Sequence, residues 1–124
     1  MVKITFNITD TPTADTGLDA LAYLEGDMQV YLHNLLFVKL PRTPLLDFAG
    51  FAQRWLDDHS APISAYLPIN KEETVLSIEK APEAGLYHFS SARAEKGDFP
   101  PVKEEAISAA FEEFLAGLEK ELRK

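Results

Sequence analysis

Three histidines and one serine–lysine pair are the residues of this sequence whose types are most readily associated with chemistry. The histidines, His33, His59 and His88, fall on three separate expected elements and lack the spacing of metal ligands. Ser77 and Lys80 match an S-x-x-K pattern, but this serine falls in an expected strand rather than at a helix N-terminus. The sequence therefore predicts that the protein is not an enzyme, and it predicts no catalytic residue, cofactor or metal ligand.

Two of the histidines have expected structural roles. His59 follows the last apolar residues of a helical pattern, where a cation interacts favourably with the helix C-terminus. His88 alternates with Tyr87 and Phe89, so in a strand it is either an outer-face residue or a hydrogen-bonded core histidine.

Neighbouring carboxylates also suggest acid–base chemistry at first sight. Adjacent residues point apart on helices and strands, so pairs in the sequence are not pairs in space. We expect solvated faces for them, and one pair, in an expected turn, could rim an interface. The four pairs are Asp57–Asp58, Glu72–Glu73, Glu104–Glu105 and Glu112–Glu113.

The stretch from residue 18 to residue 33 has two distinct faces if it is extended. Its even positions are all apolar or glycine, and its odd positions are polar or amphipathic except for Leu21. This period of two favours a strand from about Ala22 to Leu32, with Gly26 at a bulge or a bend. A short helical turn near 16–22 followed by a strand is the competing interpretation.

The polar face of this strand is the predicted interaction surface. Tyrosine is enriched at interface hot spots, and neighbouring carboxylates pair with arginine or lysine. An ordinary solvent-exposed face is the alternative, since tyrosine is also a good strand former. The predicted partner-binding residues are Tyr23, Glu25, Asp27, Gln29, Tyr31 and His33, with Glu72 and Glu73 at the rim.

The charge distribution excludes some classes of partner. The net charge is −8, from 20 acidic and 12 basic residues, which argues against nucleic acid and against anionic membrane surfaces. Between Lys3 and Lys39 there are five carboxylates and no lysine or arginine. This segment predicts either a solubilising surface or an acidic patch that steers a basic partner.

Length and composition are those of one compact domain spanning residues 1–124, with 46% hydrophobic residues and no cysteine. No apolar run approaches the length of a membrane-spanning helix, and the first ten residues alternate rather than forming a secretory signal. We therefore expect a cytoplasmic protein.

Hydrophobic periodicity and turn residues predict the order of the elements. His33–Asn34 has the character of a tight turn, Thr43 of a helix N-cap and Pro44 of a first helical residue. Helices are expected at about 44–58 and 101–123, and strands at 2–8, 22–32, 35–40, 63–69, 74–80 and 86–92. Short polar turns imply antiparallel pairing, so the expected fold is α+β, with one mainly antiparallel sheet of five or six strands packed by two helices.

The sequence resembles small acidic immunity proteins, which neutralise polymorphic toxins and the toxins of contact-dependent growth inhibition systems in bacteria. The resemblance spans about residues 21–92 and rests on element order, size, acidity and the F-x2-F-x3-W-L helix from Phe48 to Leu56. It implies non-catalytic binding of a cognate toxin domain, often a basic nuclease, by a monomer or weak homodimer. Two alternatives remain: a small enzyme or ligand-binding domain with His33 or His88 in a pocket beside a carboxylate, and a homodimer formed through a strand edge.

Overall fold

The computed structural model describes residues 2–10, 24–68, 73–94 and 99–122. The alternative of a helical turn near 16–22 falls outside these residues. The described part of the chain confirms the expected α+β class. Its elements are β1 (Val2–Asp10), β2 (Glu25–Leu32), β3 (Leu35–Pro44), α2 (Leu45–Asp57), β4 (Ile63–Tyr66), β5 (Leu76–Lys80), β6 (Leu86–Ser90), β7 (Val102–Lys103) and α3 (Glu104–Leu122).

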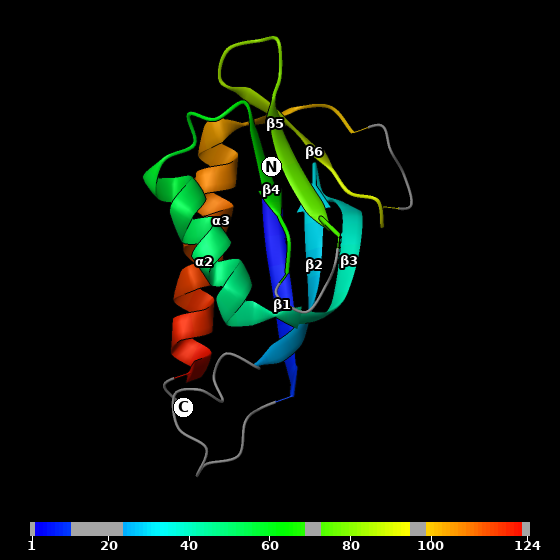
Figure 1. The fold of residues 1–124 in the computed structure, drawn as a ribbon, viewed down its shortest axis with the longest axis vertical. Helices are drawn as coiled ribbons and strands as arrows, with labels where there is room; N and C mark the ends of the chain where they lie inside the picture. The colour runs from blue at the N-terminus through cyan, green and yellow to red at the C-terminus, as the bar shows by residue number, and fades with distance from the viewer. Residues whose placement is uncertain (1, 11–23, 69–72, 95–98, 123–124) are drawn as a thin grey trace.

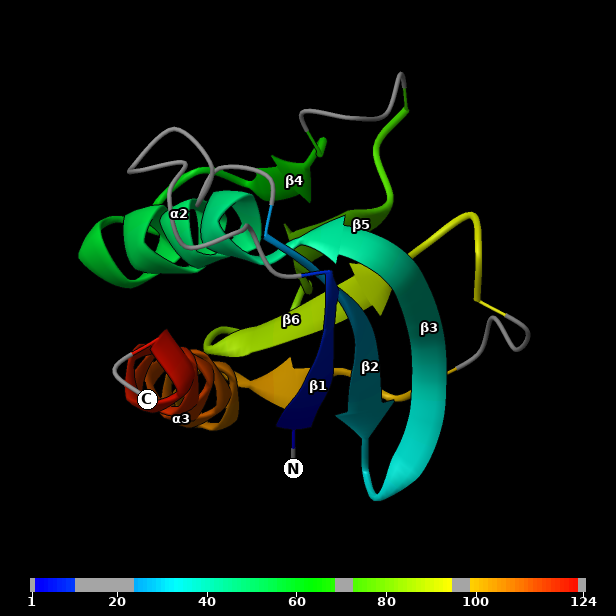
Figure 2. The ribbon, with the colours of Figure 1, turned by 90° about the horizontal axis from the view of Figure 1, so that it is seen from below.

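The described strands form two antiparallel sheets, so the expectation of one sheet is wrong. Sheet A has the order β1-β2-β3, and sheet B has the order β4-β5-β6-β7. Two register shifts interrupt the β2–β3 pairing, and bulges of this kind bend and twist a strand pair. Sheet A therefore curls beside sheet B, and the two helices lie together along one flank (Figures 1 and 2).

The alternation predicted for β2 is confirmed. Residues of this strand are buried and half-buried in strict turn from Glu25 to Leu32, with Met28 and Val30 in the core. Gly26 lies at a register shift, as expected for a bulge. A Cβ atom there would collide with the Asn7 carbonyl oxygen and stand 2.8 Å from Leu45 Cδ1, so only glycine fits.

The tight turn expected at His33–Asn34 is also confirmed. Both residues have positive φ angles, 53° and 68°, and two such residues in succession make the type I′ turn that suits the twist of a hairpin. The turn joins β2 to β3.

Both helices begin later than expected. Thr43 is not the N-cap of α2, because its hydroxyl donates to the Leu40 carbonyl at 2.7 Å and Pro44 occupies the cap position. The closing helix begins at Glu104, because Val102 and Lys103 first pair with β6 as β7, a strand the sequence did not predict.

The core between the helices and the sheets is rich in aromatic rings. Phe48 is fully buried, and its ring lies 5.1 Å from those of Tyr66 and Phe114 and 6.0 Å from that of Phe111. Residues of α2, β4 and α3 therefore meet at one side chain, which fixes the helices against each other. In the described part of the chain, no helix has the length and apolar character needed to cross a membrane.

Candidate partner-binding surfaces of sheet A

Sheet A presents one polar face whose β2 residues are only partly buried. Four of the predicted partner-binding residues share this face on β2 and are half-buried: Glu25, Asp27, Gln29 and Tyr31. Gln29 is held in place by Thr5 of β1, whose hydroxyl donates to its side-chain oxygen at 2.7 Å. Tyr23 and Glu72 lie outside the described residues. We call the face that carries these four residues, together with their neighbours on β1 and β3, the open face.

His33 stands apart from the open face. Its Nε2 lies 3.1 Å from the carbonyl oxygen of Pro100, which can only accept, so this nitrogen donates. The side chain therefore ties the β2–β3 turn to the segment before β7. Its expected role at a partner interface stays a prediction.

The open face is not uniformly acidic. In the strand register Tyr31 lies opposite Lys3 of β1, and Gln29 lies opposite Lys39 of β3. A shallow hollow of about 300 Å³ opens near Lys3 and Tyr31. The carboxylates Glu25 and Asp27 lie at the opposite end of β2 from Tyr31, so charges of both signs occur along the face.

A larger groove, here called the β1 groove, runs between β1 and α3. It has a volume of about 560 Å³ and is lined by the consecutive residues Ile4–Ile8 and by α3 residues from Glu113 to Glu121. Consecutive strand residues point to opposite faces of a sheet, so a groove that touches five in a row follows the hydrogen-bonding edge of the strand.

The backbone at this edge faces the β1 groove. The Asn7 carbonyl points toward β2, where it lies against Gly26. Because backbone groups alternate in direction along an antiparallel strand, the N–H and C=O groups of Ile4 and Phe6 point away from β2. Among the described backbone hydrogen bonds outside the sheet ladders and helices, none involves β1.

The opposite edge of sheet A has a groove of different character, here called the β3 groove. It has a volume of about 340 Å³ and is lined by Leu35–Lys39, Arg93 and Phe99. Leu35 is 59% exposed and Leu36 is 37% exposed, and the charged lining residues of the described chain are Lys39 and Arg93. This groove is therefore apolar and cationic.

Glu73, the described member of the predicted rim pair, does not lie on the open face. Its carboxylate is 3.7 Å from the Arg93 guanidinium, so it lies beside the β3 groove. The distance is that of a loose ion pair between exposed groups, which contributes little to stability. Its predicted role at the rim of an interface stays a prediction.

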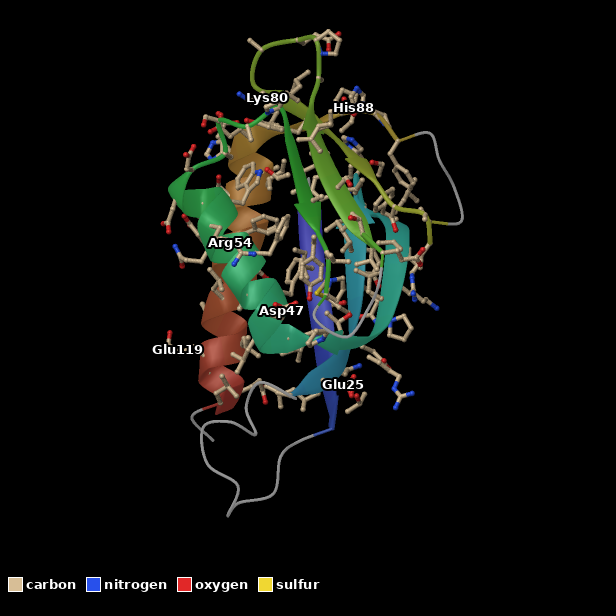
Figure 3. The ribbon with its side chains drawn as sticks, viewed as in Figure 1. Glu25, Asp47, Arg54, Lys80, His88 and Glu119 are labelled. Carbon is tan, nitrogen blue, oxygen red and sulfur yellow. The ribbon has the colours of Figure 1, made fainter. Side chains whose placement is uncertain are left out.

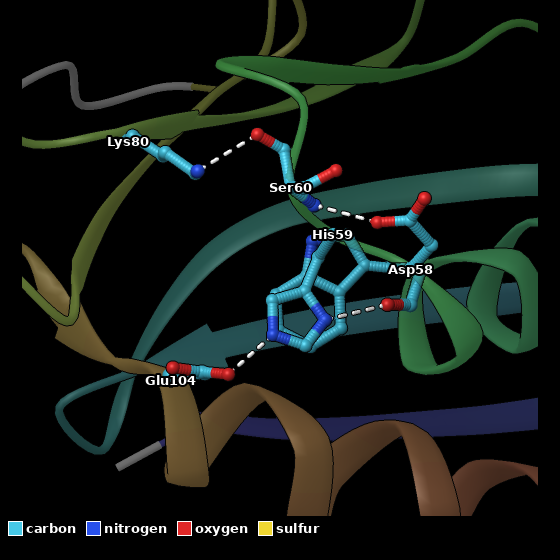
Figure 4. A network of polar contacts seen from close by, with 6 residues as sticks. Asp58, His59, Ser60, Lys80 and Glu104 are labelled. Carbon is cyan, nitrogen blue, oxygen red and sulfur yellow. Dashed lines mark hydrogen bonds and ion pairs between the residues drawn. The ribbon is translucent and has the colours of Figure 1, made fainter.

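A polar network that the sequence did not predict joins α2 to α3 (Figure 4). His59 Nδ1 lies 2.8 Å from the Trp55 carbonyl oxygen, and Nε2 contacts the Glu104 carboxylate. The imidazole stacks on the Trp55 indole, with ring centroids 4.1 Å apart. The expectation that His59 serves the C-terminus of its helix is confirmed, and its second partner lies 45 residues further along the chain.

Both partners of His59 are acceptors, so the doubly protonated imidazolium suits this position best. Burial disfavours that charge, but the hydrogen bonds to Glu104 and to the Trp55 carbonyl outweigh it and raise the pKa of His59. Burial, with the Glu104 charge in second place, raises the pKa of the neighbouring Tyr87. The network acts as a clamp that holds the start of α3.

Asp58 and Lys80 extend the same network at the surface. Asp58 accepts a hydrogen bond from the Ser60 backbone at 3.0 Å. The pKa of Asp58 is lowered chiefly by a hydrogen bond from the Ser60 side chain and next by this backbone bond. Lys80 Nζ donates to the Ser60 carbonyl at 2.7 Å. The segment that follows α2 is thereby attached to the end of β5.

The third histidine is an outer-face residue, one of its two predicted roles. His88 is exposed on β6, where it lies opposite Glu79 of β5. Figure 3 shows His88 and Lys80 at one end of the molecule and Glu25 at the other. Within the described residues, no group of three or more histidine, cysteine or carboxylate side chains could hold a metal ion.

A family model described as "Domain of unknown function (DUF7878)" matches residues 3–124. The chain belongs to the DUF7878 family. The match includes the open face and both edge grooves, from Lys3 on β1 to the end of α3. No curated protein matches the chain significantly, and no solved structure does.

Proposed function

We propose that this domain is a non-catalytic binding protein that engages the basic surface of another protein through the open face of sheet A. The observation that carries the proposal is the partly exposed polar face of β2, with Tyr31 half-buried among polar neighbours. A large, rigid side chain that is partly buried before binding loses little entropy when a partner covers it.

The negative charge of the protein supports a basic partner, although the open face itself carries charges of both signs. Helix α3 carries six glutamates and one lysine, and two of the glutamates, Glu113 and Glu121, line the β1 groove. Together with Asp27 and Glu25 on β2, these two side chains would accelerate association with a cationic protein. The partner that fits best is a cationic toxin domain, which the protein would neutralise as an immunity protein does.

Affinity capture with paired variants tests this proposal. The wild-type protein, a Tyr31→Ala/Asp27→Asn variant and a His88→Ala/Glu79→Gln control would be immobilised and exposed to the protein encoded immediately upstream. We expect nanomolar binding that weakens with salt, a loss of about thirtyfold in the first variant and no change in the control. Equal binding by both variants would exclude the open face as the binding surface.

A growth assay separates neutralisation from mere binding. Expression of the captured protein alone should arrest growth, and co-expression of this domain should restore it. Capture without growth arrest or rescue would leave a binding protein and remove the immunity role.

A further inference from the structure

We propose that the β1 groove binds an extended, lysine- or arginine-bearing segment of the partner, which joins sheet A as an additional strand beside β1. The inference rests on the proposed function in one respect: the added segment belongs to the protein partner proposed above. It specifies a mode of recognition, strand addition at a sheet edge, that the open face alone would not provide.

The first support is the geometry of the edge. The groove touches five consecutive residues of β1, and the backbone groups of Ile4 and Phe6 point into it. Main-chain groups arranged in this way accept another strand at a spacing of about 4.8 Å. The register with β2 is regular from Val2 to Ile8, so this part of the edge is straight enough to template a partner.

The second support is the shape of the groove beside the strand. Phe6 and Ile8 are half-buried, and Phe6 packs edge-on against Phe114 at 5.3 Å. Gly117 has no side chain, so the helix surface next to Phe6 is recessed. An apolar side chain at every second position of the added strand would lie over this recess, as the period of two requires.

The third support is the charge of the helical wall. Two glutamates, Glu113 and Glu121, line the groove together with one lysine, Lys120. Helix α3 as a whole carries six glutamates and one lysine. A segment whose polar positions are lysine or arginine complements this wall, whereas an acidic segment would be repelled.

A second copy of this chain is a poorer occupant than a basic partner. Each copy has a net charge of −8, and pairing two β1 edges would bring two acidic helices together. Like-charge juxtaposition of this kind opposes association. Strand addition by a basic partner meets no such repulsion.

A defined peptide provides the test. The probe is a fluorescein-labelled octapeptide of alternating valine and lysine, and its counterpart alternates valine and glutamate. Fluorescence anisotropy at low salt should show saturable binding of the lysine peptide and at least tenfold weaker binding of the glutamate peptide. No saturable binding, or equal binding of the two peptides, would overturn the proposal.

Two adjacent charge reversals on α3 locate the site. Glu113 lines the groove, whereas Glu112 is exposed outside its described lining. We expect Glu113→Lys to weaken the lysine peptide about tenfold and Glu112→Lys to leave the affinity within twofold. Equal losses of affinity in the two variants would mean that the peptide responds only to net charge, and they would contradict its assignment to the β1 groove.

Amide hydrogen exchange distinguishes strand addition from simple adhesion. Bound peptide should slow exchange at the amides of Ile4 and Phe6, which face the groove, and leave those of Thr5 and Asn7 unchanged, because they already face β2. Uniform protection, or protection confined to β3, would contradict the proposal. If the peptide fails while full-length partner binding still depends on Tyr31 and Asp27, only this inference is lost.

Discussion

The two outer strands of sheet A protect their edges in different ways. Strand β1 has a regular register from Val2 to Ile8 and has α3 beside it. Strand β3 has two register shifts, the exposed Pro41 and a left-handed residue, Arg42, with a φ of 54°. Bulges and prolines stop an edge from templating another chain, so β3 is blunted by its own sequence and β1 only by a neighbouring helix.

This difference separates two kinds of edge. An edge interrupted by proline and bulges cannot accept a long strand, whatever its charge. An edge flanked by a helix keeps its backbone groups available and acquires selectivity from the helix side chains. The contrast explains why we assign recognition to the acidic β1 groove and not to the cationic β3 groove.

The largest expected effect concerns the side of β1 that faces β2. Gly26→Ala places a methyl group against the Asn7 carbonyl and Leu45, and the backbone has no room to yield. We expect a loss of about 2–3 kcal/mol in the free energy of unfolding, measured by urea denaturation. A loss below about 0.5 kcal/mol, the range of ordinary surface substitutions, would show that the β1–β2 pairing is less rigid than described.

The His59 clamp that joins the start of α3 to the end of α2 should make stability depend on pH. Because the folded pKa of His59 is raised, its stabilising contribution is complete below the ordinary value near 6.5 and is lost as pH rises through the folded pKa. We expect a fall of about 1 kcal/mol in the free energy of unfolding between pH 6 and pH 8.

Glu104→Gln should reduce that slope, because the amide accepts a hydrogen bond but carries no charge to favour the imidazolium. The matched control is Glu105→Gln, which alters an exposed carboxylate in the same turn of α3. Unfolding curves at several pH values that stay parallel for wild type and Glu104→Gln would refute the clamp.

A second glycine-to-alanine substitution, on α3 where it faces β1, should increase the free energy of unfolding rather than lower it. Gly117→Ala places a Cβ atom 3.6 Å from the Phe6 ring, an ordinary van der Waals contact. Alanine is a better helix former than glycine, so we expect a gain of about 0.5–1 kcal/mol by urea denaturation. Destabilisation would indicate that the wall of the β1 groove is tighter than its geometry suggests.

The smallest effect on stability is expected at the other edge. Pro41→Thr returns an N–H donor to β3 at an exposed position and should change the free energy of unfolding by less than about 0.5 kcal/mol. Sedimentation velocity should nevertheless show more self-association than in wild type, because one of the devices that blunts this edge is gone. A purely monomeric variant would mean that the bulges alone are sufficient.

Local patterns in the sequence predicted local structure well. The alternation from Leu24 to Leu32 identified a strand and its buried face, and His33–Asn34 identified a hairpin turn. The division into two sheets was not predictable in this way, because it depends on which strands pair, and β3 pairs with β2 but with no described strand of sheet B. Strand β7 has only two residues and leads directly into α3, so it has no period to detect.

The candidate surface was predictable only along one strand. The sequence placed Glu25, Asp27 and Tyr31 on one face, but the lysines opposite the β2 residues come from β1 and β3. Strand order and the position of α3 decide where the grooves lie, and no local pattern encodes them. The Glu104 partner of His59 was missed for the same reason.

The contact between Phe6 and Phe114 joins segments that lie far apart in the sequence. The β2–β3 hairpin closes over a two-residue turn and can form early, whereas the contact of β1 with α3 closes a loop of more than a hundred residues. During synthesis, the edge of β1 therefore stays without its helical neighbour until α3 has left the ribosome. Chaperone demand in the cell should be greatest in that interval, and any ligand that uses both walls of the β1 groove can act only after it.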